Sequence, residues 1–339
     1  MSENGRLLSA AQLIRDHLAL NGVDKYRAET GVTKESFMAF EPKDFGGEIY
    51  AIDGSNVVVC DWSAANLNQI RAGYVVYKGR AWQKTVFTYD DVFWGDPRNY
   101  ADNFDPFVQE FFDLKGISLE ESDLDRLSSY FRELQEYIAL ADAIDQSQQG
   151  DLILYDGGFD VFKPLRDVLK HVLKFAEDKD VDLLGISKSS SLSWGEGISR
   201  PFVKHTSYAG SQLLPGVPWY LNLKDKNVDH GQNKWNGATY VARFDGRSGR
   251  AFRVDVPSYL EDRIGVTMGK IAAYSNSAEC LGYPHALFRA HRDIRITEQE
   301  GHFIKLELMN LISEMGLSKS QFEMLMEDYH DILEMRPGL

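Results

Sequence analysis

Cysteine is scarce in this chain of 339 residues. Cys60 and Cys280 are its only thiols. Two thiols supply neither a disulfide framework nor a four-ligand zinc site, so we expect a reducing, cytoplasmic environment. Long apolar runs are missing too: no stretch reaches the ~18 uninterrupted apolar residues of a transmembrane helix. The first ten residues carry charges before any apolar core, which argues against a secretory signal.

Basic residues are outnumbered, with 37 Lys and Arg against 51 Asp and Glu and a net charge of −14. This balance argues against a protein that coats nucleic acid or binds an anionic membrane. The acidic excess lies in residues 1–150 and 301–339, however, while residues 151–300 are close to neutral and contain basic clusters. A cleft formed by the middle of the chain can therefore still attract an anionic substrate.

Two motifs of common enzyme classes are absent from the sequence. It contains no GxxxxGK[ST] phosphate loop and no HExxH zinc motif. Hydrophobic residues make up 43% of the chain, which is ordinary for a globular protein. The length suits one large domain or two modest ones.

The first half of the chain is predicted to begin with a helix and continue as an antiparallel set of strands. Helical spacing covers residues 7–20, and residues 24–46 are polar and mixed, which indicates a loop or short helix. We interpret residues 47–60 as two strands joined by a turn at Asp53-Gly54-Ser55. Further strands are expected at 74–78 and 82–89, followed by a long loop at 90–118.

The rest of the chain alternates between helical and strand patterns, which is typical of a parallel segment of a sheet. Two buried strands are expected at 151–155 and 181–186, with helices before and between them at 122–146 and 161–176. The remaining elements are predicted as a loop at 190–235, strands at 239–244 and 252–256, helices at 257–273 and 284–292, and two helices over 299–334 divided by Gly316.

This order predicts an α/β fold with a ribonuclease-H-like mixed sheet flanked by helices, and with helical N- and C-terminal extensions. The predicted division is a helical N-terminal extension at 1–46, a central domain at 47–298 with an elaborated insertion and hairpin at 190–256, and C-terminal helices at 299–339.

Two carboxylates occupy matching positions. Asp53 and Asp156 each end an apolar run, and each is followed by glycine. Neighbouring strands would bring both acids to one sheet edge, where they repel each other unless a cation neutralises them. Their hard oxygen atoms suit Mg²⁺ or Mn²⁺. The alternative is that each Asp-Gly pair simply begins a turn.

Other candidates depend on these acids. Glu133 and Glu136 lie away from the apolar stripe of their predicted helix, where a solvated face is the alternative. His291 could ligate a metal, contact phosphate or transfer a proton, or it could be structural. Lys188 follows a predicted parallel strand and suits a phosphate, although it could be an ordinary surface lysine.

Basic side chains that could contact a nucleic-acid backbone form two groups. Ordinary solvated charge is the alternative for each. They are Arg243, Arg247 and Arg250 around the predicted hairpin, and Arg289 and Arg292 beside His291.

In its ordered motifs the sequence resembles the NurA nuclease family. The motifs are Ala-Ile-Asp-Gly-Ser at 51–55, Arg-x-x-x-Glu-Tyr-x-x-Leu at 132–140, Leu-Ile-Leu-Tyr-Asp-Gly at 152–157, Ile-Ser-Lys-Ser at 186–189, and Gly-Tyr-Pro followed by Ala-His at 282–291. They span about residues 47–295.

The resemblance implies a ribonuclease-H-like fold, a homodimer and dependence on Mn²⁺ or Mg²⁺. It implies 5′–3′ exonuclease and single-strand endonuclease activity on DNA, together with HerA, a hexameric ATPase, in DNA end resection or phage defence.

By the same resemblance Asp53, Glu136 and Asp156 would be metal ligands. His291 would be a further catalytic residue near the scissile phosphate, and Lys188 would contact phosphate or the active-site network. Glu133 competes with Glu136, since the loop before Asp156 leaves the spacing open.

Two other functions are compatible with the same patterns. An actin-like or sugar-kinase-like ATP-binding protein shares the fold plan and uses Asp-Gly turns to hold phosphates, although its first motif usually runs Asp-x-Gly-x-Thr. A non-catalytic scaffold would use Asp53 and Asp156 only as turn residues. In either the nuclease or the scaffold, a terminal helix could contact the ATPase.

Overall fold

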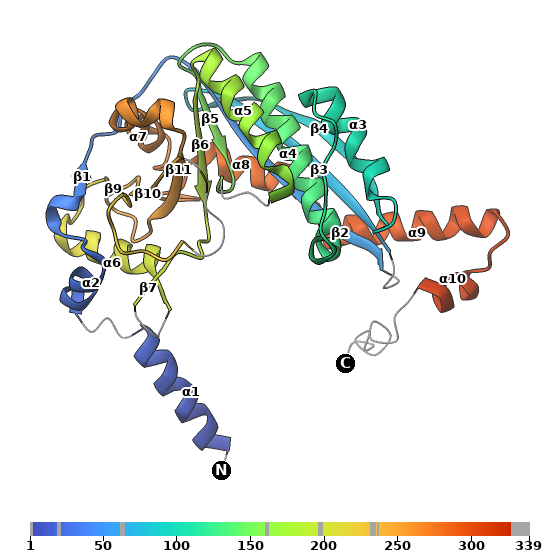
Figure 1. Cartoon of the computed structure of the whole chain (residues 1–339), viewed down its shortest axis with the longest axis horizontal. Helices are drawn as coiled ribbons and strands as arrows, with labels where there is room; N and C mark the ends of the chain where they lie inside the picture. The colour runs from blue at the N-terminus through green and yellow to red at the C-terminus, as the bar shows by residue number, and fades with distance from the viewer. Residues whose placement is uncertain are drawn as a thin grey trace.

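The computed structural model of the chain is built on one large mixed sheet (Figure 1). It describes residues 3–18, 22–61, 65–159, 163–195, 199–230, 235 and 237–326. Within these residues the sheet has nine strands, in the order β1-β9-β10-β11-β6-β5-β2-β3-β4. Among the described residues, no helix is both long and apolar enough to cross a membrane.

The long antiparallel strands come first in the central part of the chain. They are β2 (Glu48–Asp61), β3 (Asn66–Lys78) and β4 (Ala81–Gly95). β2 is continuous through Asp53-Gly54-Ser55 and pairs with β3 along its length. The prediction of two strands and a turn within residues 47–60 is therefore wrong, because the Asp-Gly-Ser run is extended backbone within a single strand.

Parallel strands continue the sheet on the other side of β2. These are β5 (Leu152–Tyr155) and β6 (Asp182–Ser187), and β5 pairs in parallel with both β2 and β6. The central order β4-β3-β2-β5-β6 is an antiparallel set followed by parallel strands. This arrangement confirms the expected ribonuclease-H-like plan.

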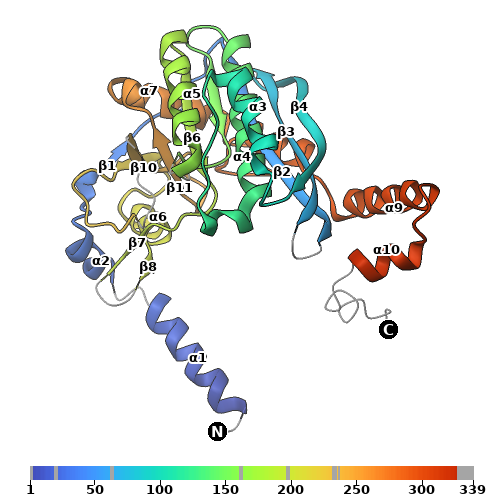
Figure 2. The ribbon, with the colours of Figure 1, turned by 45° about the vertical axis from the view of Figure 1, so that its right-hand side comes forward.

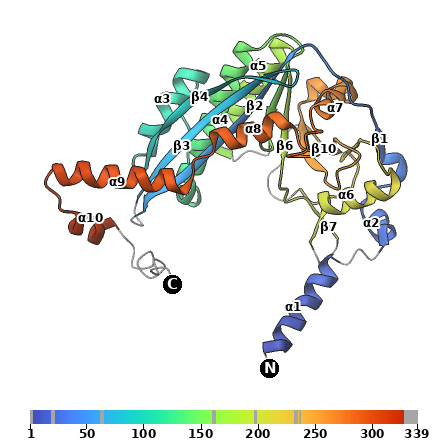
Figure 3. The same ribbon diagram turned by 180° about the vertical axis from the view of Figure 1, so that it is seen from behind.

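Helices cover both faces of these strands. α4 (Leu127–Gln146) and α5 (Arg166–Lys179) pack on one face, and the core there includes Ile52 and Tyr155. α7 (Ile264–Ala273) and α8 (His285–Ile294) pack on the other, where the core includes Ala51 and Leu154. Figure 3 shows α8 crossing this second face. Because side chains alternate along a strand, neighbouring residues of β2 and β5 serve opposite faces.

The expected loop at 90–118 contains a helix, α3 (Tyr100–Phe112). Phe104, Val108 and Phe112 are buried at steps of four and pack on the α4 face. The abundance of Asp and Asn, with Pro106 inside the helix, hides this pattern in the sequence. The prediction of a loop is wrong because burial of the aromatic stripe outweighs weak local propensity.

The far half of the sheet is antiparallel. It contains β11 (Phe252–Val256), β10 (Ala238–Arg243), β9 (Trp219–Asn222) and the edge strand β1 (Phe37–Ala39). The expected loop at 190–235 in fact supplies β9, α6 (Phe202–Leu213) and a small hairpin of β7 (Ser193–Trp194) and β8 (Arg200–Pro201).

The segment expected as a helical N-terminal extension also reaches the main body. This segment contains α2 (Gly22–Thr30), which is followed by β1. Its apolar side chains Tyr26, Val32 and Phe37 are buried in one cluster with Trp219 and Phe202. In the part of the chain that the structure describes, short 3₁₀ helices lie at Lys34–Ser36, Glu121–Arg126, Lys163–Leu165 and Ser258–Arg263.

The two ends of the described chain project from the body. α1 (Glu3–Leu18) extends away at the bottom of Figure 2, and α9 (Glu298–Glu314) and α10 (Lys319–Met326) form the other projection. The expected helical pattern at 7–20 and 299–334 is confirmed where the structure describes it. Its parts at 19–20 and 327–334 lie outside the described residues.

Candidate metal centre

Asp53 and Asp156 meet where the pairing of two parallel strands ends. β5 pairs with β2 only from Ile49 to Ile52, whose partners run from Leu152 to Tyr155. Asp53 and Asp156 are the next residue on each strand, and the Asp156 amide donates to the Ile52 carbonyl oxygen at 3.1 Å. The expected meeting of the two acids at one edge therefore occurs, although Asp53 lies within β2 and not at its end.

A third side chain comes from α8. The His291 Nδ1 atom lies 2.9 Å from Asp53 Oδ2. One ligand atom from each of Asp53, Asp156 and His291 falls within 4.8 Å of the others. Two carboxylate oxygens and an imidazole nitrogen are a donor set that suits Mn²⁺, and the carboxylates also suit Mg²⁺. The residues present therefore fit a divalent cation.

Two further side chains hold Asp156. The Lys188 ammonium lies 2.6 Å from Asp156 Oδ2, and the Tyr283 hydroxyl donates to Oδ1 at 3.1 Å. Burial and the neighbouring charge of Asp53 raise the pKa of Asp156 to about 6, while Lys188 and Tyr283 act in the opposite direction. A cation that bound here would remove this penalty, because it favours the ionised carboxylates.

Glu136 approaches from α4, on the opposite face of the sheet. It is buried, its Oε2 accepts from the Tyr155 hydroxyl at 2.7 Å, and its Oε1 pairs with Arg132. Burial raises its pKa to about 7; Arg132 opposes this, and Asp53 adds to it. A Cβ atom on Gly54 would lie only 2.7 Å from Glu136 Cγ. Glu136 is thus directly against the strand that carries Asp53.

Glu136 is not among the three residues whose ligand atoms converge, so its role as a ligand stays a prediction. Glu133, its competitor, accepts from the Tyr137 hydroxyl at 2.6 Å and is also buried. The alternative that either glutamate lies on a solvated face is wrong, because α4 is covered around much of its circumference by the sheet, α3 and α5.

The three convergent side chains open into a cleft of about 520 Å³. Its wall is polar, with two glycines after Asp156, a run of serines and two cations. The lining residues are Asp53, Gly54, Asp156, Gly157, Gly158, Ser187, Lys188, Ser189, Ser190, Ser191, Arg253 and His291. This lining offers many hydrogen-bond donors, as expected of a site for an anionic ligand.

Tyr283 is a site residue to which sequence reasoning gave no role, and Arg253 is one that it did not place at this site. Tyr283 lies in the Gly-Tyr-Pro motif before α8, so its position in that motif was an available signal. Arg253 alternates with apolar residues in β11 and forms a buried bidentate ion pair with Asp255, with Nε and Nη2 at 2.9 and 2.8 Å from its oxygens. The available signal was that charged residues, Arg253 and Asp255, occupy every second position of this short strand.

Arg243 was expected to contact a DNA backbone, and the structure contradicts this. Its side chain is buried, and Nη2 donates to the carbonyl oxygens of Leu214 and Val217 at 2.6 Å each. The guanidinium also lies over the Trp219 ring. Arg243 therefore stabilises the connection between α6 and β9.

The other four arginines remain candidates for DNA contact. Arg247 pairs with Asp245, and Arg289 pairs with Asp293 and stacks over Trp82. Arg250 and Arg292 are exposed. Arg289 and Arg292 are closest in sequence to His291, so these two are the more direct candidates.

Comparisons with known proteins give a result at the level of structure. No family model matches the sequence, and no curated protein matches it significantly. Among solved structures, the NurA nuclease from Sulfolobus solfataricus is 16% identical, with 99% of this chain and 100% of that chain covered and a TM-score of 0.55.

Two more distant matches were found as well. A NurA structure with manganese is 11% identical, covers 91% and 97% of the two chains and has a TM-score of 0.43. Endonuclease V from Ciona intestinalis in complex with DNA is 11% identical, covers 80% and 93%, and has a TM-score of 0.37. From the first match it follows that this chain has a fold similar to that of the Sulfolobus NurA nuclease over its whole length.

Proposed function

We propose that this chain is a metal-dependent deoxyribonuclease of the NurA type that hydrolyses phosphodiester bonds. The observation that carries the proposal is the convergence of Asp53, Asp156 and His291 in a polar cleft. The similarity of the fold to a NurA nuclease supports it, as do the ordered motifs of the sequence.

Asp53, Asp156 and His291 would hold Mn²⁺ or Mg²⁺, with Glu136 as a further ligand reached from the α4 face. The bound ion would lower the pKa of a water and stabilise charge on the phosphate. Tyr283 keeps Asp156 oriented through its hydroxyl. Lys188, which lies at the cleft wall with its side chain 42% exposed, is placed to bind a phosphate oxygen of the substrate.

The backbone at Asp53-Gly54 argues against an ATP-binding site of the actin-like type. Such a site holds phosphates on the amides of a turn, whereas Gly54 is paired with Ala72 of β3 in continuous strand. The nuclease proposal accounts better for an acidic cluster at this point, because a cation converts it into a phosphate-binding centre.

We further propose a homodimer that acts with a HerA-type hexameric ATPase in the cytoplasm, in DNA end resection or phage defence, with 5′–3′ exonuclease and single-strand endonuclease activity. The resemblance is the main support. Exposed apolar side chains on α1, which include Leu7, Leu8 and Ile14, suit a partner protein. The exposed edge strand β4, with Trp82, Phe87 and Trp94, suits a second copy.

The domain division at 46/47 and 298/299 also stays a proposal, with α2 and β1 added to the body of the nuclease. Deletion of residues 1–20 and, separately, of 299–339 tests the docking of the ATPase. We expect one of the two deletions to abolish co-elution with HerA. Unchanged co-elution in both would refute the role of the ends.

The activity is tested by a time course on end-labelled single- and double-stranded DNA with Mn²⁺, Mg²⁺ or EDTA. We expect metal-dependent shortening by the native chain and none by the Asp53→Asn or Asp156→Asn variants, which should still bind DNA. Asp167→Asn is a matched control, because Asp167 is exposed and paired with Lys170 on α5. Metal-dependent cleavage by the purified Asp53→Asn variant would refute the assignment. Comparison of DNA labelled at the 5′ end with DNA labelled at the 3′ end gives the direction of digestion.

A further inference from the structure

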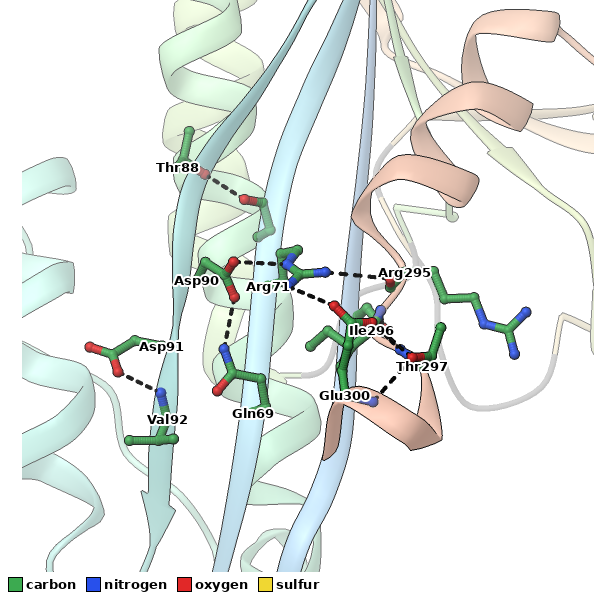
Figure 4. A network of polar contacts seen from close by, with 12 residues as sticks. Gln69, Arg71, Thr88, Asp90, Asp91, Val92, Arg295, Ile296, Thr297 and Glu300 are labelled. Atoms are coloured by element: carbon green, nitrogen blue, oxygen red, sulfur yellow. Dashed lines mark hydrogen bonds and ion pairs between the residues drawn. The ribbon is translucent and has the colours of Figure 1, made fainter. Parts of the chain in front are cut away.

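The junction between α8 and α9 is bound to β2 and β3 of the sheet (Figure 4). The Ile296 amide donates to Ser55 Oγ at 3.0 Å, and Ser55 lies two residues after Asp53 on β2. The carbonyl oxygen of Arg295 accepts from Arg71 Nη1 at 3.5 Å. Arg71 is the partner of Ser55 across the β2–β3 pair, just as Gly73 is the partner of Asp53.

Arg71 connects the junction to two acids at once. Its Nε lies 3.0 Å from Asp90 Oδ2 on β4, and its Nη2 lies 3.2 Å from Glu300 Oε1 in the first turn of α9. The guanidinium also lies over the Phe87 ring, and its side chain is only 16% exposed. A planar fork with several donors is what allows three such contacts, and a lysine could not reproduce them.

The junction lies very close to the metal centre along the chain. His291 precedes Arg295 by four residues, which is about one helical turn or ~6 Å along a helix axis. Asp53 precedes Ser55 by two residues, ~7 Å along a strand. The contacts of Arg71 and Ser55 thus hold the chain just after α8 on the sheet. The bound segment lies about one helical turn from His291, and the Ser55 that binds it lies two residues from Asp53 on β2.

We propose that Arg71 is a positioning residue, which sets the placement of His291 against Asp53 by holding the α8–α9 junction on β2 and β3. The expected effect of Arg71 on metal affinity rests on the proposed metal centre. Its geometric part, the contact of His291 with Asp53, does not depend on any bound ion. Arg71 itself touches neither ligand in the contacts described here.

Three variants of the full-length chain test this inference. Arg71→Gln removes the fork. Glu300→Gln weakens the same link from the other side but preserves the capping box of α9, in which Thr297 and Glu300 bond reciprocally and Gln serves as well as Glu. Arg263→Gln is the control: Arg263 also pairs with two acids, Asp180 and Asp182, but at the opposite end of β6 from Lys188.

The first readout is the nitrogen NMR spectrum of the His291 ring in the metal-free protein, which reports the bond to Asp53. We expect it to change in Arg71→Gln and Glu300→Gln and to be unchanged in Arg263→Gln. The second readout is Mn²⁺ affinity by calorimetry. We expect a loss of about tenfold for Arg71→Gln and a smaller loss for Glu300→Gln. The double variant should be little worse than Arg71→Gln alone, because both changes break one link.

The outcomes separate the two proposals. A native chain that binds no Mn²⁺ overturns the proposed metal centre, while the His291 spectra still decide whether Arg71 positions the ring. Unchanged His291 signals in both Arg71→Gln and Glu300→Gln overturn the inference. Equal effects in Arg263→Gln would also overturn it, since they would assign the change to a general loss of stability. If Arg71→Gln does not fold, Glu300→Gln alone decides.

Discussion

Gly54 is the residue at which a single added methyl group should be most informative. A Cβ atom there would lie 2.7 Å from Cγ and 2.9 Å from Cδ of Glu136, closer than carbon atoms pack in proteins. Glu136 cannot simply rotate away, because its two carboxylate oxygens are bound to Arg132 and to the Tyr155 hydroxyl. We therefore expect Gly54→Ala to destabilise the fold.

The size of the effect follows from two opposing terms. Overpacking a buried position typically costs about 1–3 kcal/mol. Replacement of glycine by alanine at a compatible backbone conformation returns about 0.4–1 kcal/mol by reducing the freedom of the unfolded chain. The net expectation is a decrease of about 1–2 kcal/mol in the free energy of unfolding, measured by urea denaturation in EDTA.

Gly46→Ala is the matched control, because a Cβ atom on Gly46 would meet nothing within 4 Å. We expect that variant to be as stable as the native chain or slightly more stable. The double variant Gly54→Ala/Glu136→Ala should recover the overpacking term, since the atoms that clash are then absent. Equal stability of Gly54→Ala and Gly46→Ala would refute the placement of Glu136 against β2.

Three further predictions concern the titration of Glu136, the binding of Mn²⁺ and the role of Arg243. Burial raises the pKa of Glu136 from 4.5 to about 7. The folded state therefore binds this proton more tightly than the unfolded state does, and stability from this group is lost as pH rises from about 4.5 towards 7, by up to about 3 kcal/mol. Thermal melts in EDTA should accordingly show a steeper decrease over this range for the native chain than for Glu136→Gln, and parallel curves would contradict this. Mn²⁺ at about 100 times its dissociation constant should raise the unfolding free energy by about 2.7 kcal/mol, and Asp156→Asn should abolish the increase in the same melts. Arg243→Met should cost about 1–3 kcal/mol in urea denaturation, because two partly buried carbonyl oxygens lose their donor. DNA affinity measured by fluorescence anisotropy on folded protein should stay unchanged.

The core of the candidate site could be predicted because its signals are local. Asp53 and Asp156 each follow an apolar run that β-propensity identifies, and parallel strands bring such positions to one edge. The prediction of a turn at Asp53-Gly54-Ser55 was wrong, and no local sequence pattern indicates the reason. Glycine is needed at 54 because α4 brings Glu136 against that point, and the same residue type would also have served a turn.

Features that depend on tertiary contacts were the ones missed. The helix α3 has a buried stripe whose partners lie on α4 and β4, and α6 contains two Ser, one Gly and one His among its 12 residues. Arg243 has the same local sequence character as Arg247, yet one is buried under carbonyl oxygens and the other is exposed. The difference depends on how α6 packs over β10, which periodicity does not indicate.

The alternation of β2 explains why the candidate site draws on both faces of the sheet. Ala51 and Ile52 serve opposite cores, so Asp53 points to the α8 face and Gly54 to the α4 face. His291 meets Asp53 on the first face, and Glu136 meets Gly54 on the second. The charge of Asp53 raises the pKa of Glu136 although the two side chains lie on opposite faces of β2. A side chain at position 54 would clash with Glu136. One missing methyl group therefore allows an acid from the far face of the sheet to approach the strand that carries Asp53.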